Sequence, residues 1–349
     1  MLSFQRRDEE LKLLLHSRFW PSVGGIETVA ELLAREWVKQ NIGVTIVTDV
    51  APPSERPFFP FQICYRPGPR VFVDLLREHD AFIHFNVSLR AIWPLFIVRR
   101  PFVAVHHGFY VIDELGHRDW REKLKLFITK HATKNIAVSE SISRAIGIPC
   151  NIILNPFASD VFNNAKEHLK SGDLVFLGRL VSSKGAHVLI QAMALIKASG
   201  LELKLTIIGD GPEREGLENL ARDLGVHDQT FFTGPIPTDE VARILSEHKV
   251  LVVPSIWNEG FGVVALEGIA SGCVVIGSDS GGLPEAIGKC GLVVRTDDAE
   301  ALAVAVRRVF TETNLMATLR SNAPDHLARH TPARVAQRYI AVIAGALSR

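Results

Sequence analysis

The sequence predicts an α/β protein built from two doubly wound parallel sheets. Short apolar segments alternate with segments of helical periodicity along most of the 349 residues, and this alternation is typical of parallel sheets with crossover helices. The chain length accommodates two domains of ordinary size. A polar stretch at 163–173 interrupts the alternation near the middle of the chain and predicts the linker between the domains.

The strands of the first domain are expected at short apolar runs with helices or loops between them. Residues 11–16 predict the first strand, 19–25 a loop with Pro and Gly-Gly, and 26–40 a helix. The further strands are expected at 44–48, 82–85, 102–106, 135–138 and 152–154.

The second domain repeats the alternation more regularly. Its strands are expected at 174–177, 204–208, 229–232, 250–253, 273–276 and 292–294. An amphipathic helix at 331–347 begins beside Pro332, as helices often do. We therefore expect a first domain at 1–165, a second at 172–330, and a terminal helix, about 331–349, that packs back on the first domain.

Composition limits the classes of function. The chain is 47% hydrophobic and 22% charged with a net charge of +1, which describes an ordinary globular protein without a global field for nucleic acid. Its four cysteines lack metal-ligand spacing and favour a reducing compartment. The chain has no apolar run of membrane-spanning length, and its polar amino terminus does not resemble a secretory signal. These features predict a cytoplasmic protein, with the inner face of the membrane as a further expectation.

Two glutamates eight positions apart, Glu259 and Glu267, bracket the most informative segment. An apolar strand at 251–254 precedes it, a helix at 263–271 follows, and Glu267 is expected about two turns into that helix. Gly260 and Gly262 permit a sharp turn at the carboxyl edge of the sheet, where ligands bind. Carboxylates there can accept hydrogen bonds from sugar hydroxyls. The alternative is a solvated helix start with favourable acidic residues.

Two cations, Arg179 and Lys184, flank a short loop after the strand at 174–177. A guanidinium and an ammonium that converge there would neutralise a diphosphate and stabilise it as a leaving group. The alternative is a solvated basic turn.

Glycines at other strand ends are weaker signals. Gly24 and Gly25 precede the first helix, where backbone N–H groups can bind phosphate, although the loop matches neither common nucleotide-binding fingerprint. Gly209 and Gly234 end two strands of the second domain, where backbone groups could contact a nucleobase. All four glycines are equally compatible with simple turns.

A histidine at the end of the strand at 102–106 is a candidate general base or sugar contact. The chemistry leaves His106 and His107 as alternatives, and a histidine that only fills the core is a third. The segment 118–134 interleaves cations with large apolar residues. Such a helix can lie on an anionic membrane or pack on the sheet with its charges in water.

With these motifs the chain resembles the retaining glycosyltransferases of the GT-B fold, called group 1 or family 4, over nearly its whole length. The strongest matching segment is 254–272. Further matches are Gly178-Arg179-Leu180 through Lys184-Gly185, Gly209-Asp210-Gly211-Pro212, 280–285, Gly24-Gly25-Ile26-Glu27, Val138-Ser139-Glu140 and Asn155-Pro156. Two departures are Gly268, where the family usually has Ala, and Pro156, where many members have Gly.

The resemblance implies two Rossmann-like domains facing across a cleft, and roles for particular residues. Arg179 and Lys184 would bind the diphosphate, Glu267 the ribose, and Glu259 the transferred sugar. The same resemblance places further donor contacts at Gly24, Gly25, Gly178, Gly209, Gly234, Gly260, Phe261 and Gly262. It places the family histidine at His107, with His106 as the alternative.

The implied reaction is retaining, metal-independent transfer of a hexose-like unit from a nucleoside-diphosphate sugar, as co-substrate, to an acceptor hydroxyl. The expected acceptor is a glycan or a lipid-linked molecule in envelope polysaccharide, lipopolysaccharide or glycolipid synthesis. No resident cofactor, no metal and no nucleic-acid partner are expected. The alternatives are a nucleotide-sugar epimerase or a sugar phosphorylase on the same fold, and a non-catalytic subunit that binds sugar nucleotides.

Overall fold

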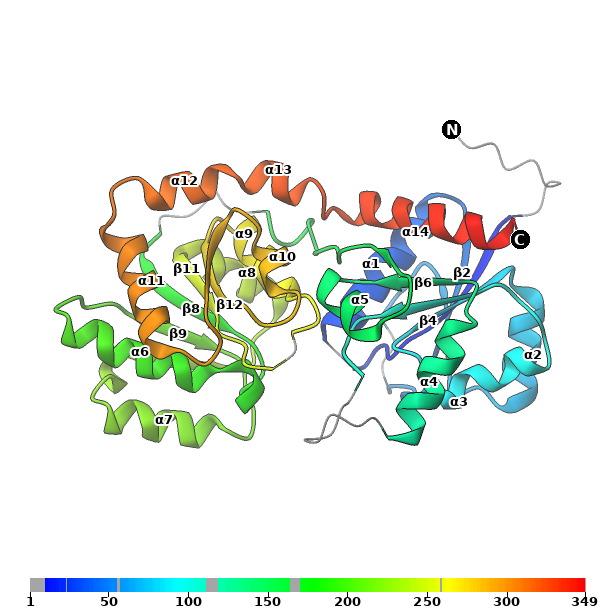
Figure 1. Ribbon diagram of the computed structural model, residues 1–349, viewed down its shortest axis with the longest axis horizontal. Helices are drawn as coiled ribbons and strands as arrows, with labels where there is room; N and C mark the ends of the chain where they lie inside the picture. The colour runs from blue at the N-terminus through cyan, green and yellow to red at the C-terminus, as the bar shows by residue number, and fades with distance from the viewer. Residues whose placement is uncertain are drawn as a thin grey trace. The chain divides into compact units, whose positions relative to one another are not determined.

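The computed structural model describes residues 10–22, 24–54, 57–110, 119–163, 170–257 and 259–348. The chain divides into two compact units (Figure 1). Unit 1 comprises Met1–Pro156 together with Pro332–Arg349, and unit 2 comprises Phe157–Thr331. Each unit contains one parallel sheet with helices, so the predicted α/β class is confirmed.

Unit 1 has a seven-stranded parallel sheet in the order β3-β2-β1-β4-β5-β6-β7. The strands are apolar and largely buried, as is typical of parallel sheets covered on both faces. Their bounds are β1 Lys12–His16, β2 Gly43–Thr48, β3 Gln62–Tyr65, β4 Ala81–Phe85, β5 Phe102–His106, β6 Lys134–Ala137 and β7 Asn151–Ile152.

The helices of unit 1 include one from the end of the chain. Helix α14 packs against α1, and the indole Nε1 of Trp37 donates a hydrogen bond of 3.3 Å to the carbonyl of Ala336. The buried side chains of α14, among them Tyr339 and Ile343, recur at helical spacing on one face. The helices are α1 Gly25–Lys39, α2 Pro69–Glu78, α3 Leu89–Ile92, η1 Trp93–Phe96, α4 Trp120–Lys130, α5 Glu140–Ile146 and α14 Pro332–Leu347.

An aromatic cluster forms a core of unit 1 beside α2 and α3. Phe72 of α2, Phe82 of β4 and Phe102 of β5 are buried in it. Ile128 of α4 packs against the same cluster. Helices α2, α3 and α4 therefore cover the same face of the sheet (Figure 1).

Unit 2 has a six-stranded parallel sheet in the order β10-β9-β8-β11-β12-β13. The strands are β8 Gly172–Leu177, β9 Leu205–Ile208, β10 Thr230–Gly234, β11 His248–Val253, β12 Val274–Ser278 and β13 Gly291–Val294. The helices are η2 Ser182–Lys184, α6 Ala186–Ala198, α7 Arg214–Asp223, η3 His227–Gln229, α8 Thr238–Glu247, α9 Val263–Ala270, α10 Leu283–Ile287, α11 Ala299–Thr311, α12 Leu315–Ser321 and α13 Ala323–Leu327. Helices α6 and α11 pack together over the main core.

The structure has elements that we did not predict from the sequence, and its two units divide at a different residue. Strand β3 and helix α2 lie in a part of the chain for which we predicted no element. Strand β3 is short, has no fully buried residue and lies at the edge of the sheet, so it lacks the apolar run of a central strand. The two units divide after Pro156, earlier than 165, because Phe157 and Phe162 are buried and Phe157 N donates to His330 O in unit 2.

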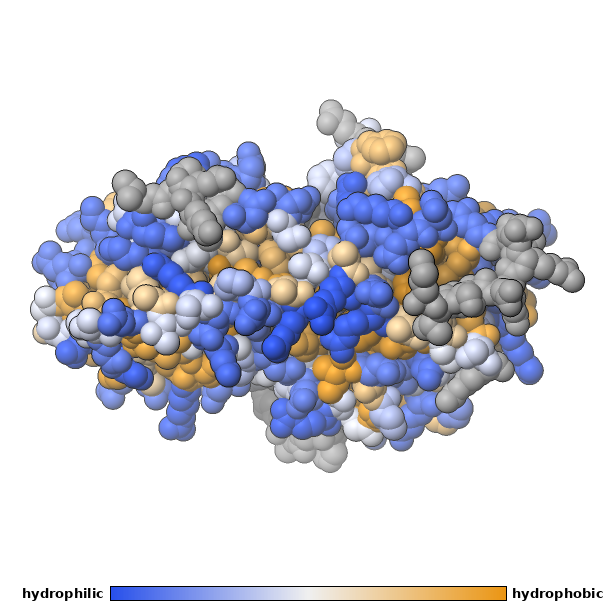
Figure 2. Space-filling view, turned by 90° about the horizontal axis from the view of Figure 1, so that it is seen from above, coloured by the Kyte–Doolittle hydropathy of each residue, from blue (hydrophilic) through white to orange (hydrophobic). Residues whose placement is uncertain are grey.

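Figure 2 shows a face on which hydrophilic residues predominate, with smaller hydrophobic areas between them, in keeping with 22% charged residues. Among the helices of the described ranges, none has both the length and the apolar character needed to cross a bilayer.

Candidate active site

The strand order of unit 2 creates a point where the chain connections change direction. Strands β8 and β11 are neighbours, and the chain leaves β8 toward β9 on one side and β11 toward β12 on the other. In doubly wound sheets, ligands bind at the carboxyl ends of such a strand pair. The loops at these ends are 178–185 after β8 and 254–262 after β11, and they contain Arg179, Lys184 and Glu259.

The structure brings the two loops into direct contact. The ammonium Nζ of Lys184 lies 2.6 Å from Oε2 of Glu259. The backbone N–H of Ile256 donates a 2.8 Å hydrogen bond to the carbonyl of Ser183, which holds the loops together. The Lys184 side chain is 37% exposed and that of Glu259 is 15% exposed. The pair therefore remains open to a ligand on the lysine side.

Two serines that we did not predict as site residues position Glu259. The hydroxyl of Ser255 donates to Glu259 Oε2 at 3.0 Å, so this oxygen accepts from both Ser255 and Lys184. The backbone N–H of Glu259 donates to Ser280 Oγ at 3.4 Å, and its carbonyl accepts from Gly282 N at 2.8 Å. The available signal was a serine directly after an apolar strand and another at the start of a Gly-Gly turn.

The turn at Gly281 requires glycine. Its φ of +58° is in the left-handed region, and a Cβ built there would lie 2.0 Å from the carbonyl oxygen of Glu259. Since that backbone oxygen cannot move freely, any side chain at this position displaces the Glu259 loop.

We expect Gly281→Ala to lower the melting temperature and to weaken ligand binding at the Glu259 loop. Strain at a positive φ alone costs about 1 kcal/mol or more of folding free energy, and the clash adds to it. Thermal melting and ligand titration measure the two effects. The matched control is Gly216→Ala in α7, where a Cβ meets nothing within 4 Å, so no loss is expected. Equal stability of both variants would contradict this role of Gly281.

Glu267 lies in the second turn of α9, about one turn earlier than expected, although the helix begins at Val263 as predicted. Within the described ranges, no residue forms a hydrogen bond or ion pair with its carboxyl group. Burial raises the pKa of Glu267 to about 7. Near pH 7 the Glu267 carboxyl group therefore populates both its protonated and its ionised form. This is expected of a group whose hydrogen-bond donors are supplied by a bound ligand.

The remaining predicted residues of unit 2 line the same edge of the sheet. Arg179 is exposed and does not join the Lys184–Glu259 pair. Strand ends β8 and β9 approach so closely that a Cβ on Gly209 would lie 2.0 Å from the carbonyl oxygen of Gly178. Gly234 ends β10, Gly260 and buried Phe261 follow Glu259, and Gly262 precedes the first residue of α9.

The predicted glycines of unit 1 stand at the start of α1. Gly24 is its N-cap with extended backbone, and Gly25 is its first residue. A Cβ on Gly24 would meet the Glu27 carboxylate at 2.8 Å, whereas one on Gly25 meets nothing within 4 Å. Because this carboxylate is the end of a flexible side chain that can move, the structure requires glycine at neither position.

Neither His106 nor His107 is exposed. The ring of His106 contacts Asn135 Oδ1 at 3.0 Å and Tyr110 Oη at 2.9 Å. The ring of His107 packs on Phe85 at 4.5 Å, and its nitrogens have no partner in the described part of the chain. Burial, with His106 as a smaller influence, lowers the pKa of His107 to about 3, so its imidazole is neutral at pH 7.

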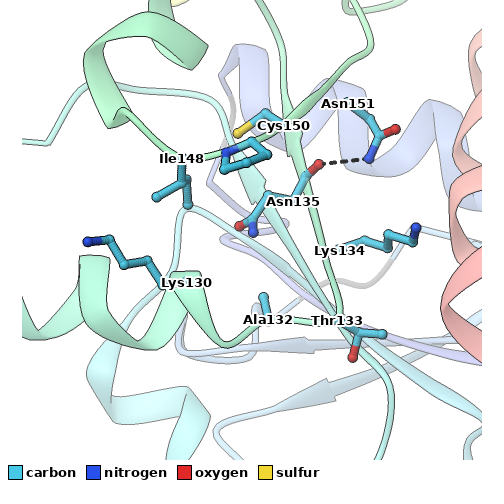
Figure 3. Close-up of a pocket in the computed structure, with 9 residues that line it drawn as sticks. Lys130, Ala132, Thr133, Lys134, Asn135, Ile148, Cys150 and Asn151 are labelled. Carbon is cyan, nitrogen blue, oxygen red and sulfur yellow. Dashed lines mark hydrogen bonds between the residues drawn. The ribbon is translucent and has the colours of Figure 1, made fainter. Parts of the chain in front are cut away.

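A cavity of about 380 Å³ lies in unit 1, and Asn135, the hydrogen-bond partner of His106, is one of the residues that line it (Figure 3). It is lined at the amino ends of β6 and β7 by residues that include Lys130, Lys134 and Cys150. Lys130 and Lys134 extend in opposite directions (Figure 3), so their charges do not converge on one ligand. In the described ranges, no group of three or more His, Cys, Asp or Glu side chains is arranged to hold a metal ion.

The fold and these loops define a two-domain α/β protein with Rossmann-like sheets and a charged site at the switch point of the second. Residues 159–326 match the family model of "Glycosyl transferases group 1". A glycosyltransferase of Methanocaldococcus jannaschii is 36% identical over 284 residues, which is 72% of this chain and 69% of the relative. The chain therefore belongs to the group 1 glycosyltransferases, and the predicted family is confirmed.

Other matches agree on family and fold. A "D-inositol 3-phosphate glycosyltransferase" of Corynebacterium urealyticum is 32% identical over 212 residues, which is 58% of this chain. The match spans only 45% of that relative's length. The solved structure of Anabaena HepE in complex with UDP-glucose covers 96% of this chain and 100% of its own, with a TM-score of 0.75 and 17% identity. This likeness confirms the predicted GT-B fold.

Proposed function

We propose that the chain transfers a sugar from a nucleoside-diphosphate sugar to an acceptor hydroxyl, with retention at the anomeric carbon. The observation that carries this proposal is the contact between Lys184 and Glu259 at the carboxyl ends of β8 and β11. It gives a cation for the diphosphate and a carboxylate for the sugar hydroxyls at one place.

The difficult step is the departure of the diphosphate while positive charge develops on the sugar ring. Arg179 and Lys184 are proposed to neutralise the departing oxygens. Glu259, held by Ser255, is proposed to accept hydrogen bonds from the hydroxyls of the transferred sugar. Without ligand, Lys184 and Glu259 form an ion pair with each other. When the donor binds, Lys184 would exchange this contact for the diphosphate and Glu259 would exchange it for the sugar hydroxyls.

The roles of the remaining predicted residues follow from the same proposal. Glu267 is assigned to the ribose, and backbone groups at Phe261 and Gly262 to the donor near the sugar. Gly24 and Gly25 stay predicted contacts of the donor phosphates. Because a pKa of about 3 makes the His107 imidazole a weak base at pH 7, we assign it a hydrogen bond to the substrate in place of proton abstraction.

The acceptor is proposed to be a glycan or a lipid-linked molecule of the cell envelope. One relative is named for D-inositol 3-phosphate, which is a polyol, and this name supports a hydroxyl-rich acceptor. The four cysteines are all free thiols, which favours a reducing cytoplasmic location. The diphosphate charge is met by Arg179 and Lys184, so the proposal requires no metal ion and no resident cofactor.

A thermal-shift panel of nucleoside diphosphates and their sugars tests the proposal. A ligand that binds only the folded state raises the melting temperature by mass action, so we expect one base to stabilise the chain more than the others. Product analysis with the labelled sugar nucleotide then distinguishes transfer from epimerisation. If no compound of the panel shifts the melting temperature, the proposal fails. Binding without any turnover would instead indicate a non-catalytic subunit.

The raised pKa of Glu267 predicts a pH dependence of donor affinity. Hydroxyl donors of the ribose favour the charged carboxylate, so binding should strengthen as the pH rises through about 7 and level off above it. We expect the donor Kd to be about tenfold higher at pH 6 than at pH 8. Calorimetric titration with the intact sugar nucleotide is the measurement, because its diphosphodiester has no terminal phosphate that titrates in this range.

Glu267→Gln should bind more weakly and lose this pH dependence, whereas Glu300→Gln, at an exposed position of α11, should keep it. An unchanged Kd of the natural chain between pH 6 and pH 8 would remove Glu267 from the ribose site.

A further inference from the structure

Helix α4 presents large apolar side chains on its outer face. Trp120, Leu124 and Phe127 are 64%, 39% and 59% exposed, and their spacing puts them on one face of a helix with 3.6 residues per turn. The inward face of the same helix is formed by Leu126 and Thr129, which are buried. Helix α4 is therefore apolar on the side that packs and also along the side that faces out.

Cations flank this outward stripe. Arg121, Lys123 and Lys130 are exposed, and the period of the helix puts Arg121 on one side of the stripe and the two lysines on the other. The acidic residue of the helix, Glu122, is paired with Lys125 at 2.5 Å. The outer face of α4 thus combines uncompensated positive charge with exposed apolar area.

A second apolar element lies on the same face of the sheet. Phe96 of η1 and the following Ile97 are 81% and 59% exposed, while their neighbours Leu95 and Val98 pack against the aromatic cluster that Ile128 of α4 also contacts. Five of the thirteen exposed large hydrophobic residues in the described ranges thus belong to these two elements. Such a concentration is more than the scattered exposure expected of a protein surface.

We propose that the outer face of α4, together with Phe96 and Ile97 on the same side of the sheet, docks on a membrane that contains anionic phospholipids. The apolar side chains would enter the boundary between headgroups and acyl chains, and the flanking cations would meet the lipid phosphates. The charge complementarity favours this occupant, because an apolar stripe with cations on both sides matches acyl chains beneath anionic headgroups. The inference goes beyond the proposed function and does not depend on it.

Flotation of the full chain with phospholipid vesicles, in the absence of any sugar nucleotide, is the test. We expect binding to vesicles of phosphatidylcholine and phosphatidylglycerol, and little binding to phosphatidylcholine alone. High salt should weaken the interaction, since it screens the cations. The charge variant Arg121→Glu, Lys123→Glu, Lys130→Glu should bind at least about 100-fold more weakly. The apolar variant Trp120→Ser, Leu124→Ser, Phe127→Ser should bind at least about tenfold more weakly.

Matched controls use exposed residues of unit 2. Lys289→Glu, Arg307→Glu, Arg329→Glu changes the net charge equally, and Phe231→Ser with Val304→Ser removes apolar area that is 50% and 55% exposed. Both controls should bind vesicles as the natural chain does. Thermal melting confirms that each variant is folded. Equal binding by charge variant and charge control would overturn the proposal.

A different occupant of the apolar stripe would also overturn the proposal. If the natural chain ignores anionic vesicles but forms a dimer that the apolar variant breaks, the surface is an interface between copies of the chain. If it ignores vesicles and stays monomeric, the bilayer is likewise excluded as the occupant. Because no donor is present, either failure leaves the proposed transferase activity to its own test.

Discussion

Replacing Lys184 by alanine is expected to lower the rate of sugar transfer at least about 100-fold, which corresponds to about 2.7 kcal/mol of transition-state stabilisation. The ammonium lies 2.6 Å from Glu259 at the switch point of unit 2, where the departing diphosphate is proposed to be neutralised. Steady-state kinetics with the donor identified by thermal shift gives the rate. The effect should appear mainly in kcat, because charge on the leaving group develops in the transition state.

Stability should change little in this variant, because a lysine that is 37% exposed gains little from an ion pair in water. Lys289→Ala, on the exposed surface of unit 2, is the matched control and should transfer sugar at the natural rate. Lys184→Ala at a near-natural rate would refute the assignment.

Glu259→Gln tests the other half of the pair. It keeps the shape of the side chain but removes the charge, and we expect a loss of at least about 100-fold. If the two residues act on one transition state, the double variant should lose much less than the product of the two single losses. If the loss of the double variant equals the product of the two single losses, Lys184 and Glu259 act independently.

Unit 1 is expected to lose stability in mild acid. Burial lowers the pKa of His106 to about 4 and that of His107 to about 3, from an ordinary 6.5. Above pH 6.5 the folded and unfolded chains are both neutral at these rings. Below pH 6.5 these histidines become protonated in the unfolded chain but stay neutral in the folded chain. The free energy of unfolding therefore falls as the pH drops from 6.5 to about 4. Each histidine then costs about 3 kcal/mol at pH 4.

His107→Phe is the sharpest probe of this effect. The ring packs on Phe85 and its nitrogens have no partner in the described part of the chain, so a phenyl ring can replace it without losing a hydrogen bond. Urea unfolding at several pH values should show that the free energy of unfolding of this variant falls less steeply below pH 6.5, which is the acid limb of its stability profile. His227→Gln, at an exposed position of unit 2, should leave the limb unchanged. The same acid limb in all three proteins would show that the acid sensitivity has another source.

The sequence predicted the class of fold and the edge of the sheet that carries the site, because both depend on local patterns. Apolar runs of strand length alternate with helical periodicity, and β5 was predicted with its observed bounds. Glycines and charges directly after apolar strands pointed to the carboxyl edge, which topology makes common to all parallel strands. For this reason the sequence predicts that Lys184 and Glu259, 75 residues apart, both lie at this edge.

Other features depend on contacts that no local pattern records. Ser255 and Ser280 position Glu259 through hydrogen bonds whose partners are set by the packing of loops after β11 and β12. The edge strand β3 escaped prediction because its residues are only partly buried.

The strongest example is helix α4. Its sequence shows cations interleaved with large apolar residues, but periodicity alone does not tell which apolar side chains pack and which remain in water. Packing on the sheet buries Leu126 and leaves Trp120 and Phe127 outside. Periodicity in the sequence thus determined that unit 1 and unit 2 each form a parallel sheet. Only tertiary structure decided which faces stay exposed, because burial depends on the neighbours that distant segments supply.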